Sequence, residues 1–205
     1  MFVVLWGAAD AASRLAHTTL GADTSLTVFG PAAAMDPALL NSLRGGASSA
    51  TSTAPAPFIP TRLKVPSVGI DAQVEQVGQK ADGTMATPTS FADVAWYAPG
   101  GHPGSEGNTV FAGHVNNALT KSGVFGHLAQ VGLGDYVTVS NADGHTLIYK
   151  VVSIDEYPAN EAPAASIFAT AGPSRLVLIT CDGDWVQSEK TFDKRLVITA
   201  KPVLQ

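Results

Sequence analysis

The sequence predicts a mainly β protein whose strands form a closed or nearly closed barrel. From Thr61 onward, short runs of branched and aromatic residues alternate with turns rich in Gly, Pro and Asp. Regular spacing of short strands between such turns is typical of β-barrels. A region of about 145 residues is long enough to bury a sizeable core.

The expected elements follow one another along this region. Branched and aromatic runs predict eight strands, at residues 62–65, 72–77, 95–97, 109–114, 136–141, 146–157, 175–181 and 195–201. An amphipathic pattern predicts one helix at residues 123–130. The connection at residues 158–173 is expected to hold a second short helix at residues 164–169.

Residues 1–57 differ in composition from residues 58–205, and we expect a flexible or weakly helical N-terminal extension to a single domain. Ala, Ser, Thr, Gly and Pro crowd residues 45–57, which is typical of a flexible linker. The apolar start at residues 1–9 stops at Asp10 and has no basic flank. It is shorter than the roughly 20 residues that span a bilayer.

Charge and residue spacing argue against several classes of function. The formal net charge of −5 argues against a nucleic-acid partner. No cluster of His and Cys has zinc spacing, and no glycine pair lies in a phosphate-binding loop. Asp155, Glu156 and Glu161 are three acidic residues in about seven positions, which is common on a solvated rim. We therefore predict no metal and no cofactor.

The single cysteine, Cys181, is the leading candidate for chemistry. It ends the apolar run at residues 176–181 and precedes the turn signal Asp182-Gly183, so the thiol is expected where a strand meets a loop. A lone cysteine cannot form an internal disulfide, and many such residues are simply small buried hydrophobes. A position that is rigid on one side and open on the other favours a nucleophile.

A thiol with the ordinary pKa of about 8.5 needs an acid–base partner and a nearby positive charge at neutral pH. His114 ends a strand-like run, and Gly113 before it would let another backbone come close. Arg195 opens a further strand-like run and would reach a developing oxyanion, with Arg175 and Lys194 as rival sources of charge. The other four histidines are expected in turns, at structural or exposed positions, or outside the domain.

The motifs around these residues resemble those of the sortases, the cysteine transpeptidases of Gram-positive cell surfaces. The resemblance covers about residues 61–203 and is carried by Ala112-Gly113-His114-Val115, by Leu178-Ile179-Thr180-Cys181 and by the downstream strand that bears Arg195. Matching segments also lie at residues 63–72, 96–100 and 132–135. The pattern looks most like class F, the actinobacterial type. It departs from that class at Asp182-Gly183, where Gly-Gly is expected.

This resemblance implies an eight-stranded sortase barrel and a defined set of roles. Cys181 would attack the Thr–Gly amide of a Leu-Pro-x-Thr-Gly sorting signal and form a thioacyl intermediate. His114 would exchange protons with the leaving and incoming amines, and Arg195 would stabilise the oxyanion. Thr180, Ala112 and Ile179 are the implied substrate contacts, and the connection at residues 158–173 would form one wall of the groove.

The implied partners are surface proteins that carry sorting signals, and an amine acceptor from a cell-wall precursor or a pilin. The implied location is extracytoplasmic, at the cell surface, either membrane-associated or secreted. Family members usually carry an N-terminal membrane anchor, and some have a segment before the barrel that shields the site. Two roles are therefore open for residues 1–57, as the remainder of an anchor or as a cover over the groove.

Two other functions fit the same residues. In a mainly hydrolytic cysteine peptidase, water would replace the amine acceptor. In a non-catalytic barrel, the groove would bind peptides without turnover. An L,D-transpeptidase is disfavoured because its Ser-His-Gly-Cys run is missing.

Overall fold

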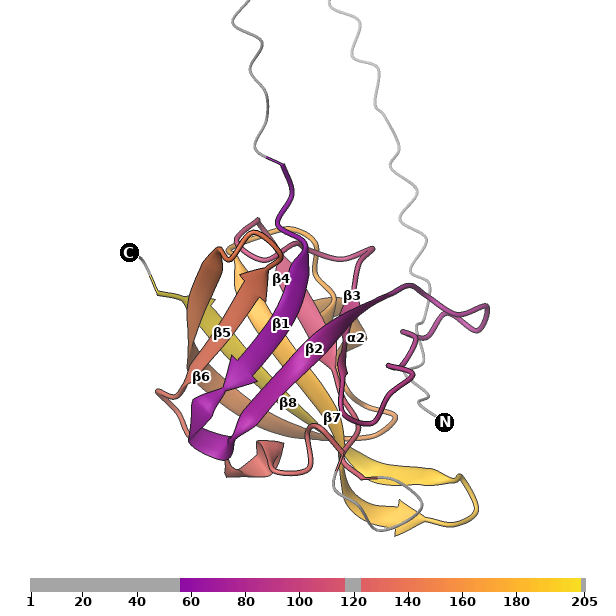
Figure 1. The fold of residues 1–205 in the computed structure, drawn as a ribbon. Coiled ribbons are helices and arrows are strands. Elements are labelled where there is room, and N and C mark those ends of the chain that lie inside the picture. Colours follow the sequence, from indigo (N-terminus) through magenta and orange to yellow (C-terminus); the bar gives the residue numbers. More distant parts are fainter. Residues whose placement is uncertain (1–55, 117–122, 204–205) are drawn as a thin grey trace, which may run out of the picture. The chain divides into compact units, whose positions relative to one another are not determined.

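Eight strands close into a barrel in the computed structural model, which describes residues 56–116 and 123–203 (Figure 1). They are β1 (Pro60–Val65), β2 (Ile70–Val77), β3 (Val94–Tyr97), β4 (Asn108–Ala112), β5 (Tyr136–Asn141), β6 (Thr146–Pro158), β7 (Arg175–Val186) and β8 (Thr191–Pro202). Their order is β1-β2-β3-β4-β7-β8-β6-β5, and the pairing of β1 with β5 closes the barrel. The predicted eight-stranded barrel is therefore confirmed. Almost all of the predicted extension at residues 1–57 lies outside the described residues.

Alternation along the strands divides the side chains between two hydrophobic clusters. On β7, Leu176 and Leu178 point into the barrel interior, whereas Val177 and Ile179 belong to a cluster on the outer face. A strand that is buried on both faces reads as a continuous apolar run, which explains the sequence at residues 176–179. The outer cluster is covered by the short helix α2 (Ala164–Ile167) in the β6–β7 connection, close to the predicted 164–169.

Two of the strand pairs are parallel, and they determine which residues meet. β2 pairs with β3 in parallel, and β4 pairs with β7 in parallel. The second pair joins segments that β5 and β6 separate in the sequence. It brings the end of β4 to the end of the apolar part of β7, with Ala112 beside Ile179.

The predicted helix at residues 123–130 is wrong. The segment folds into successive tight turns and ends in the 3-10 helix η2 (Leu128–Gln130), because its backbone bonds join residues three apart, such as Gly126 N–H to Gly123. Gly123 contributes to this outcome, since a Cβ atom there would collide with the carbonyl of His114. The apolar pattern instead reflects packing, because Phe125, Leu128 and Val131 belong to the interior cluster of the barrel.

The prediction of a turn at Asp182-Gly183 is also wrong. β7 continues to Val186, and with the start of β8 it forms a hairpin that projects from the barrel (Figure 1). The pairing register shifts after Asp182, and Gly183 has a φ of +79°, so the dipeptide forms a bulge rather than the chain reversal. Trp185 and Phe192 stack edge to face across the hairpin, with ring centroids 5.4 Å apart.

Other strand bounds differ from the prediction by a few residues. β4 ends at Ala112, so His114 lies two residues beyond it, and β8 begins at Thr191 rather than Arg195. In residues 56–116 and 123–203, no helix has both the length and the hydropathy needed to cross a membrane.

Candidate active site

Cys181 and Arg195 lie directly opposite each other in the β7–β8 ladder. On its other side, Arg195 pairs with Tyr157 of β6. Because Leu178 points inward, alternation places the Cys181 side chain on the outer face, two residues from Ile179. Cys181 is only 8% exposed, so its side chain lies on the outer face but is largely shielded from water.

Two opposing effects act on the Cys181 thiol. Burial raises its pKa above the ordinary 9.0, because desolvation penalises the thiolate. The positive charge of Arg195 lowers the pKa, whereas the adjacent Asp182 raises it further, and the net shift is upward. The thiol is therefore predominantly protonated at neutral pH, and Arg195 is the charge that counteracts this.

Arg195 is 1% exposed and is held in place by the hairpin. Its Nη1 donates to the carbonyl oxygens of Phe192 and Lys194, at 2.9 and 2.7 Å, and its Nη2 donates to Thr191 Oγ1 at 3.1 Å. Of the two rival cations, Lys194 forms an ion pair with Glu156 at 3.2 Å. Arg175 begins β7, six residues before the cysteine. Of the three cations, Arg195 is the one that the strand register places directly opposite Cys181.

Gly113 joins the segment that carries His114 to β7. The Gly113 N–H donates to the Ile179 carbonyl at 3.2 Å, and the Thr180 hydroxyl donates to the Gly113 carbonyl at 2.9 Å. These bonds extend the contact between the β4 and β7 segments beyond Ala112, and continuation of the parallel register would bring His114 to the level of Cys181. The expected close approach at Gly113 involves side chains, because a Cβ atom there would lie 2.7 Å from atoms of Val124 and Phe125.

The β2–β3 loop, residues 78–93, holds the imidazole of His114. Nε2 lies 3.3 Å from the carbonyl oxygen of Pro88, and since a carbonyl only accepts, Nε2 carries the proton. The ring of Phe91 packs on the imidazole, with centroids 4.4 Å apart. Nδ1 is then the nitrogen that takes up and releases the second proton.

A carboxylate on β2 fixes this part of the loop. Both oxygens of Glu75 lie within 3.1 Å of the Thr89 N–H, and both lie 3.0 Å from the Thr89 hydroxyl. One oxygen also accepts from the Ser90 N–H at 3.1 Å. Sequence reasoning missed Glu75, Pro88 and Phe91, because no motif or periodicity marks a turn-rich loop as a neighbour of His114.

The pKa of His114 is lowered from its ordinary 6.5, chiefly because burial disfavours the imidazolium. The bond to the Pro88 carbonyl and the negative charge of Glu75 act in the opposite direction. At neutral pH the structure therefore favours a neutral imidazole beside a neutral thiol.

The three predicted substrate contacts occupy two different faces. Ala112 and Ile179 belong to the outer cluster, beside each other and next to the outward position of Cys181. Thr180 is 1% exposed, and its hydroxyl is bonded to Gly113, so it joins β7 to β4. Ile167 and Phe168, at the end of α2, pack in the same outer cluster.

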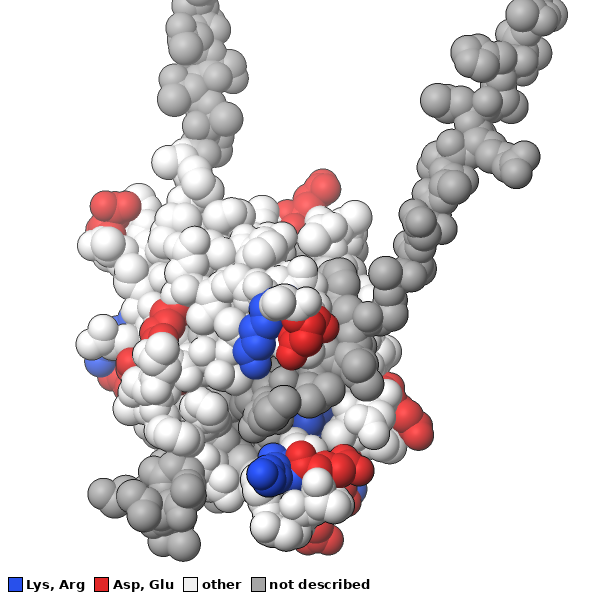
Figure 2. Space-filling model, turned by 90° about the vertical axis from the view of Figure 1, so that its right-hand side faces the viewer, with Lys and Arg blue, Asp and Glu red and all other residues white. Residues whose placement is uncertain are grey.

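Within the described residues, no group of three or more His, Cys, Asp or Glu side chains is arranged to hold a metal ion. Asp155, Glu156 and Glu161 do not form such a group. His102 packs against Trp96, with ring centroids 5.1 Å apart, and its Nδ1 lies 3.4 Å from the Phe58 carbonyl. Figure 2 shows that charged side chains on one side of the molecule are few and of mixed sign.

Comparison with known proteins links this geometry to one family. The family model described as the Sortase domain matches residues 63–203, which is more than half of the chain. No curated protein sequence matches the chain.

Solved structures share the fold. Sortase C-1 from Actinomyces oris is 24% identical, with a TM-score of 0.55, over 70% of this chain and 73% of that one. Sortase A from Corynebacterium diphtheriae is 18% identical, with a TM-score of 0.55, over 73% of this chain and 62% of that one. Sortase A from Listeria monocytogenes is 21% identical, with a TM-score of 0.54, over 72% of this chain and 88% of that one. Since the family model spans nearly the whole barrel, including the strands around Cys181, the chain belongs to the sortase family of cysteine transpeptidases.

Proposed function

We propose that this sortase cleaves a Leu-Pro-x-Thr-Gly sorting signal between Thr and Gly and transfers the acyl group to an amine. The observation that carries the proposal is the pairing of Cys181 with Arg195 across the β7–β8 ladder, together with the bond that joins Thr180 to Gly113, the residue before His114. In this proposal, Ala112 and Ile179 form the floor on which the motif lies. Thr180 is a positioning residue, because its hydroxyl is engaged by Gly113.

In the acylation step, the Cys181 thiolate attacks the carbonyl carbon of the Thr residue. The negative charge on the tetrahedral oxygen is stabilised by Arg195 and the backbone near Cys181. The C–N bond then breaks, and the His114 imidazolium gives its proton to the departing glycine amine. A thioester between enzyme and substrate remains. General acid assistance of this kind typically contributes about 10²- to 10⁴-fold to the rate.

In the second step, an incoming amine attacks the thioester carbonyl. His114, now neutral, accepts a proton from this amine, and the C–S bond breaks to release the Cys181 thiolate. The product is a new amide, and the thiolate–imidazolium pair is restored. The acceptor in this proposal is an amine of a cell-wall precursor or a pilin, and the substrates are surface proteins at the extracytoplasmic side of the cell.

Mass spectrometry of the intact protein tests this proposal. Incubation with Leu-Pro-x-Thr-Gly peptides, x being varied, is expected to add the mass of the peptide up to Thr to the wild type only. Cys181→Ala is the control and should remain unmodified. An adduct on both proteins, or on neither, would contradict the assignment of the nucleophile.

The fate of the acyl group separates transfer from hydrolysis. Addition of a labelled glycine peptide is expected to give the ligated product as the main species. If the free acid dominates at saturating amine, the chain is a mainly hydrolytic peptidase. If both wild type and Cys181→Ala bind the peptide and neither cleaves it, the barrel is a binding module.

A further inference from the structure

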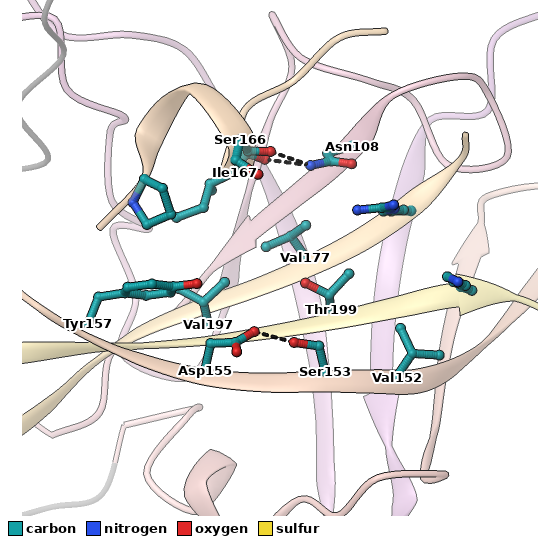
Figure 3. A pocket seen from close by; sticks show the side chains of 13 residues that line it. Asn108, Val152, Ser153, Asp155, Tyr157, Ser166, Ile167, Val177, Val197 and Thr199 are labelled. Atoms are coloured by element: carbon teal, nitrogen blue, oxygen red, sulfur yellow. Dashed lines mark hydrogen bonds between the residues drawn. The ribbon is translucent and has the colours of Figure 1, made fainter. Parts of the chain in front are cut away.

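A pocket of about 350 Å³ lies on the outer face of the barrel, between α2 and β6 (Figure 3). Val177, Val197 and Thr199 of β7 and β8 form its floor, and Tyr157 lies toward one end. The α2 wall is anchored by Asn108, whose Nδ2 donates to the carbonyls of the two helix residues drawn beside it, at 2.8 and 3.0 Å. The pocket is therefore built by strands and a fastened helix.

Two cations line this pocket, Arg175 at the start of β7 and Lys201 near the end of β8. The Nε atom of Arg175 is buried and has no hydrogen-bond partner among the described residues. Neither cation belongs to an ion pair in that part of the chain. The one carboxylate that lines the pocket, Asp155, accepts a hydrogen bond from the Ser153 hydroxyl. The lining therefore carries one excess positive charge.

Strand register places the pocket on the same face as the thiol. The outward residues of β7 are Cys181, Ile179, Val177 and Arg175 in turn, and the first three pair with Arg195, Val197 and Thr199 of β8. Arg175 lies six residues before Cys181, which is about 20 Å along a strand. Along β8, the pocket lining runs from Val197, which pairs with Ile179, to Lys201.

We propose that this pocket binds a carboxylate side chain of the substrate polypeptide about three residues before the sorting motif. The inference rests on the proposed function, because it takes the scissile Thr to lie at Cys181. The proposal takes the substrate to run extended along β7, with its N-terminal side toward Arg175. Such a peptide advances about 3.3 Å per residue, so six residues upstream of that Thr reach the level of Arg175. The Leu of the motif is three residues upstream of the Thr, so the residue at the cations is the third before Leu.

The chemistry of the lining selects a carboxylate. A guanidinium whose Nε–H is buried without a hydrogen-bond partner gains most from a charged acceptor, and carboxylates match the geometry of guanidinium donors. Asp155 pairs with Val197, which lies four residues before Lys201 on β8 and is therefore nearer the thiol than the cations. Its carboxylate disfavours an acidic residue at that level. The pocket therefore distinguishes where along the peptide an acidic residue lies.

Two peptides test the proposal on the full-length protein. One is Glu-Ala-Ala-Leu-Pro-Ala-Thr-Gly, and the other has Gln in place of Glu. We expect the wild type to have a KM about tenfold lower for the Glu peptide, with little change in kcat. Arg175→Gln and Lys201→Gln should each remove most of this preference without altering turnover of the Gln peptide. Raising the salt concentration should weaken the preference as well.

Lys150→Gln is the matched control, because Lys150 pairs with Lys201 across the β6–β8 ladder but does not line the pocket. It removes the same charge and should retain the preference. Arg175→Lys keeps the positive charge and should retain part of the preference for the Glu peptide. Equal KM values for the two peptides in the wild type, or a loss in Lys150→Gln equal to that in Lys201→Gln, would overturn the proposal.

Binding to Cys181→Ala, measured by fluorescence anisotropy with the same two labelled peptides, separates this inference from the proposed function. Tighter binding of the Glu peptide without cleavage by the wild type would retain the pocket and reject the transpeptidase. Cleavage by the wild type with equal binding of both peptides would retain the transpeptidase and reject the pocket. Neither binding nor cleavage of either peptide would reject both.

Discussion

The carbonyl oxygen of Pro88 lies 3.3 Å from Nε2 of His114, and this contact assigns the tautomer of the imidazole. The bond comes from a loop that Glu75 holds through Thr89 and Ser90. The proton-transfer group of the proposed reaction is thus oriented by a backbone carbonyl and a stacked phenyl ring. Four predictions follow from the surroundings of His114 and Cys181.

Replacing Glu75 with Gln should lower the pKa of His114, because the negative charge that favours the imidazolium is removed. The acid limb of the kcat/KM profile should then move to lower pH. Phe91→Ala should move it to higher pH, since loss of the stacked ring exposes the imidazole to water. Asp82→Asn is the control: Asp82 bonds Thr84 in the same loop and does not contribute to the pKa of His114. Shifts of equal sign in Glu75→Gln and Phe91→Ala would contradict this account.

The pH–rate profile should be bell-shaped, with an acid limb below pH 6.5 and an alkaline limb above pH 9.0. Burial lowers the pKa of His114 from the first value and raises that of Cys181 from the second. Between the two limbs, the reactive thiolate–imidazolium form is a minority, because the imidazole loses its proton at lower pH than the thiol does. The rate of thiol alkylation by iodoacetamide, measured at varied pH, reports the pKa of Cys181 and so checks the alkaline limb. A flat profile from pH 5 to 9 would disprove the coupled pair.

Arg195→Gln should reduce kcat/KM by about 100- to 1000-fold, because the charge opposite Cys181 is lost. The alkaline limb should also move to higher pH, since Arg195 lowers the pKa of the thiol. Thermal unfolding is measured alongside, because the variant also leaves the Phe192 and Lys194 carbonyls without their donor, at a cost of about 1–3 kcal/mol. Lys194→Gln removes a neighbouring charge paired at the surface and should change kcat/KM less than twofold. Similar losses in both variants would rule out a specific role for Arg195.

Thr180→Val should lower kcat without raising KM, because the lost hydroxyl aligns Gly113 and therefore His114. The missing bond should cost about 1 kcal/mol of unfolding free energy. Thr180→Ser keeps the hydroxyl and should restore most of the activity. A large rise in KM with unchanged kcat would instead identify Thr180 as a direct substrate contact.

The sequence predicted the parts of the molecule that local patterns determine. Runs such as residues 175–181 predict strands because branched side chains suit a pleated and buried surface. Cys181, His114 and Arg195 were predicted as site residues because each terminates or opens such a run in a specific motif. Residues 123–130 were misassigned because an apolar face that fills the end of a barrel has the same periodicity as a helix.

The features that were missed depend on contacts distant in sequence. Pro88 lies 26 residues from His114, and nothing near either residue marks their contact. The hairpin was missed because Asp182-Gly183 has the composition of a turn. The pairing of Trp185 with Phe192 and of Val186 with Thr191 across the hairpin shows that the chain continues in extended form.

The parallel junction of β4 and β7 has a consequence for biogenesis. The Thr180–Gly113 bond joins residues 67 positions apart, and long-range pairing of this kind is slow to form during folding. An emerging polypeptide thus carries its thiol without an imidazole beside it until both strands have docked. In the proposed reaction, transfer activity should therefore appear only once the barrel has closed.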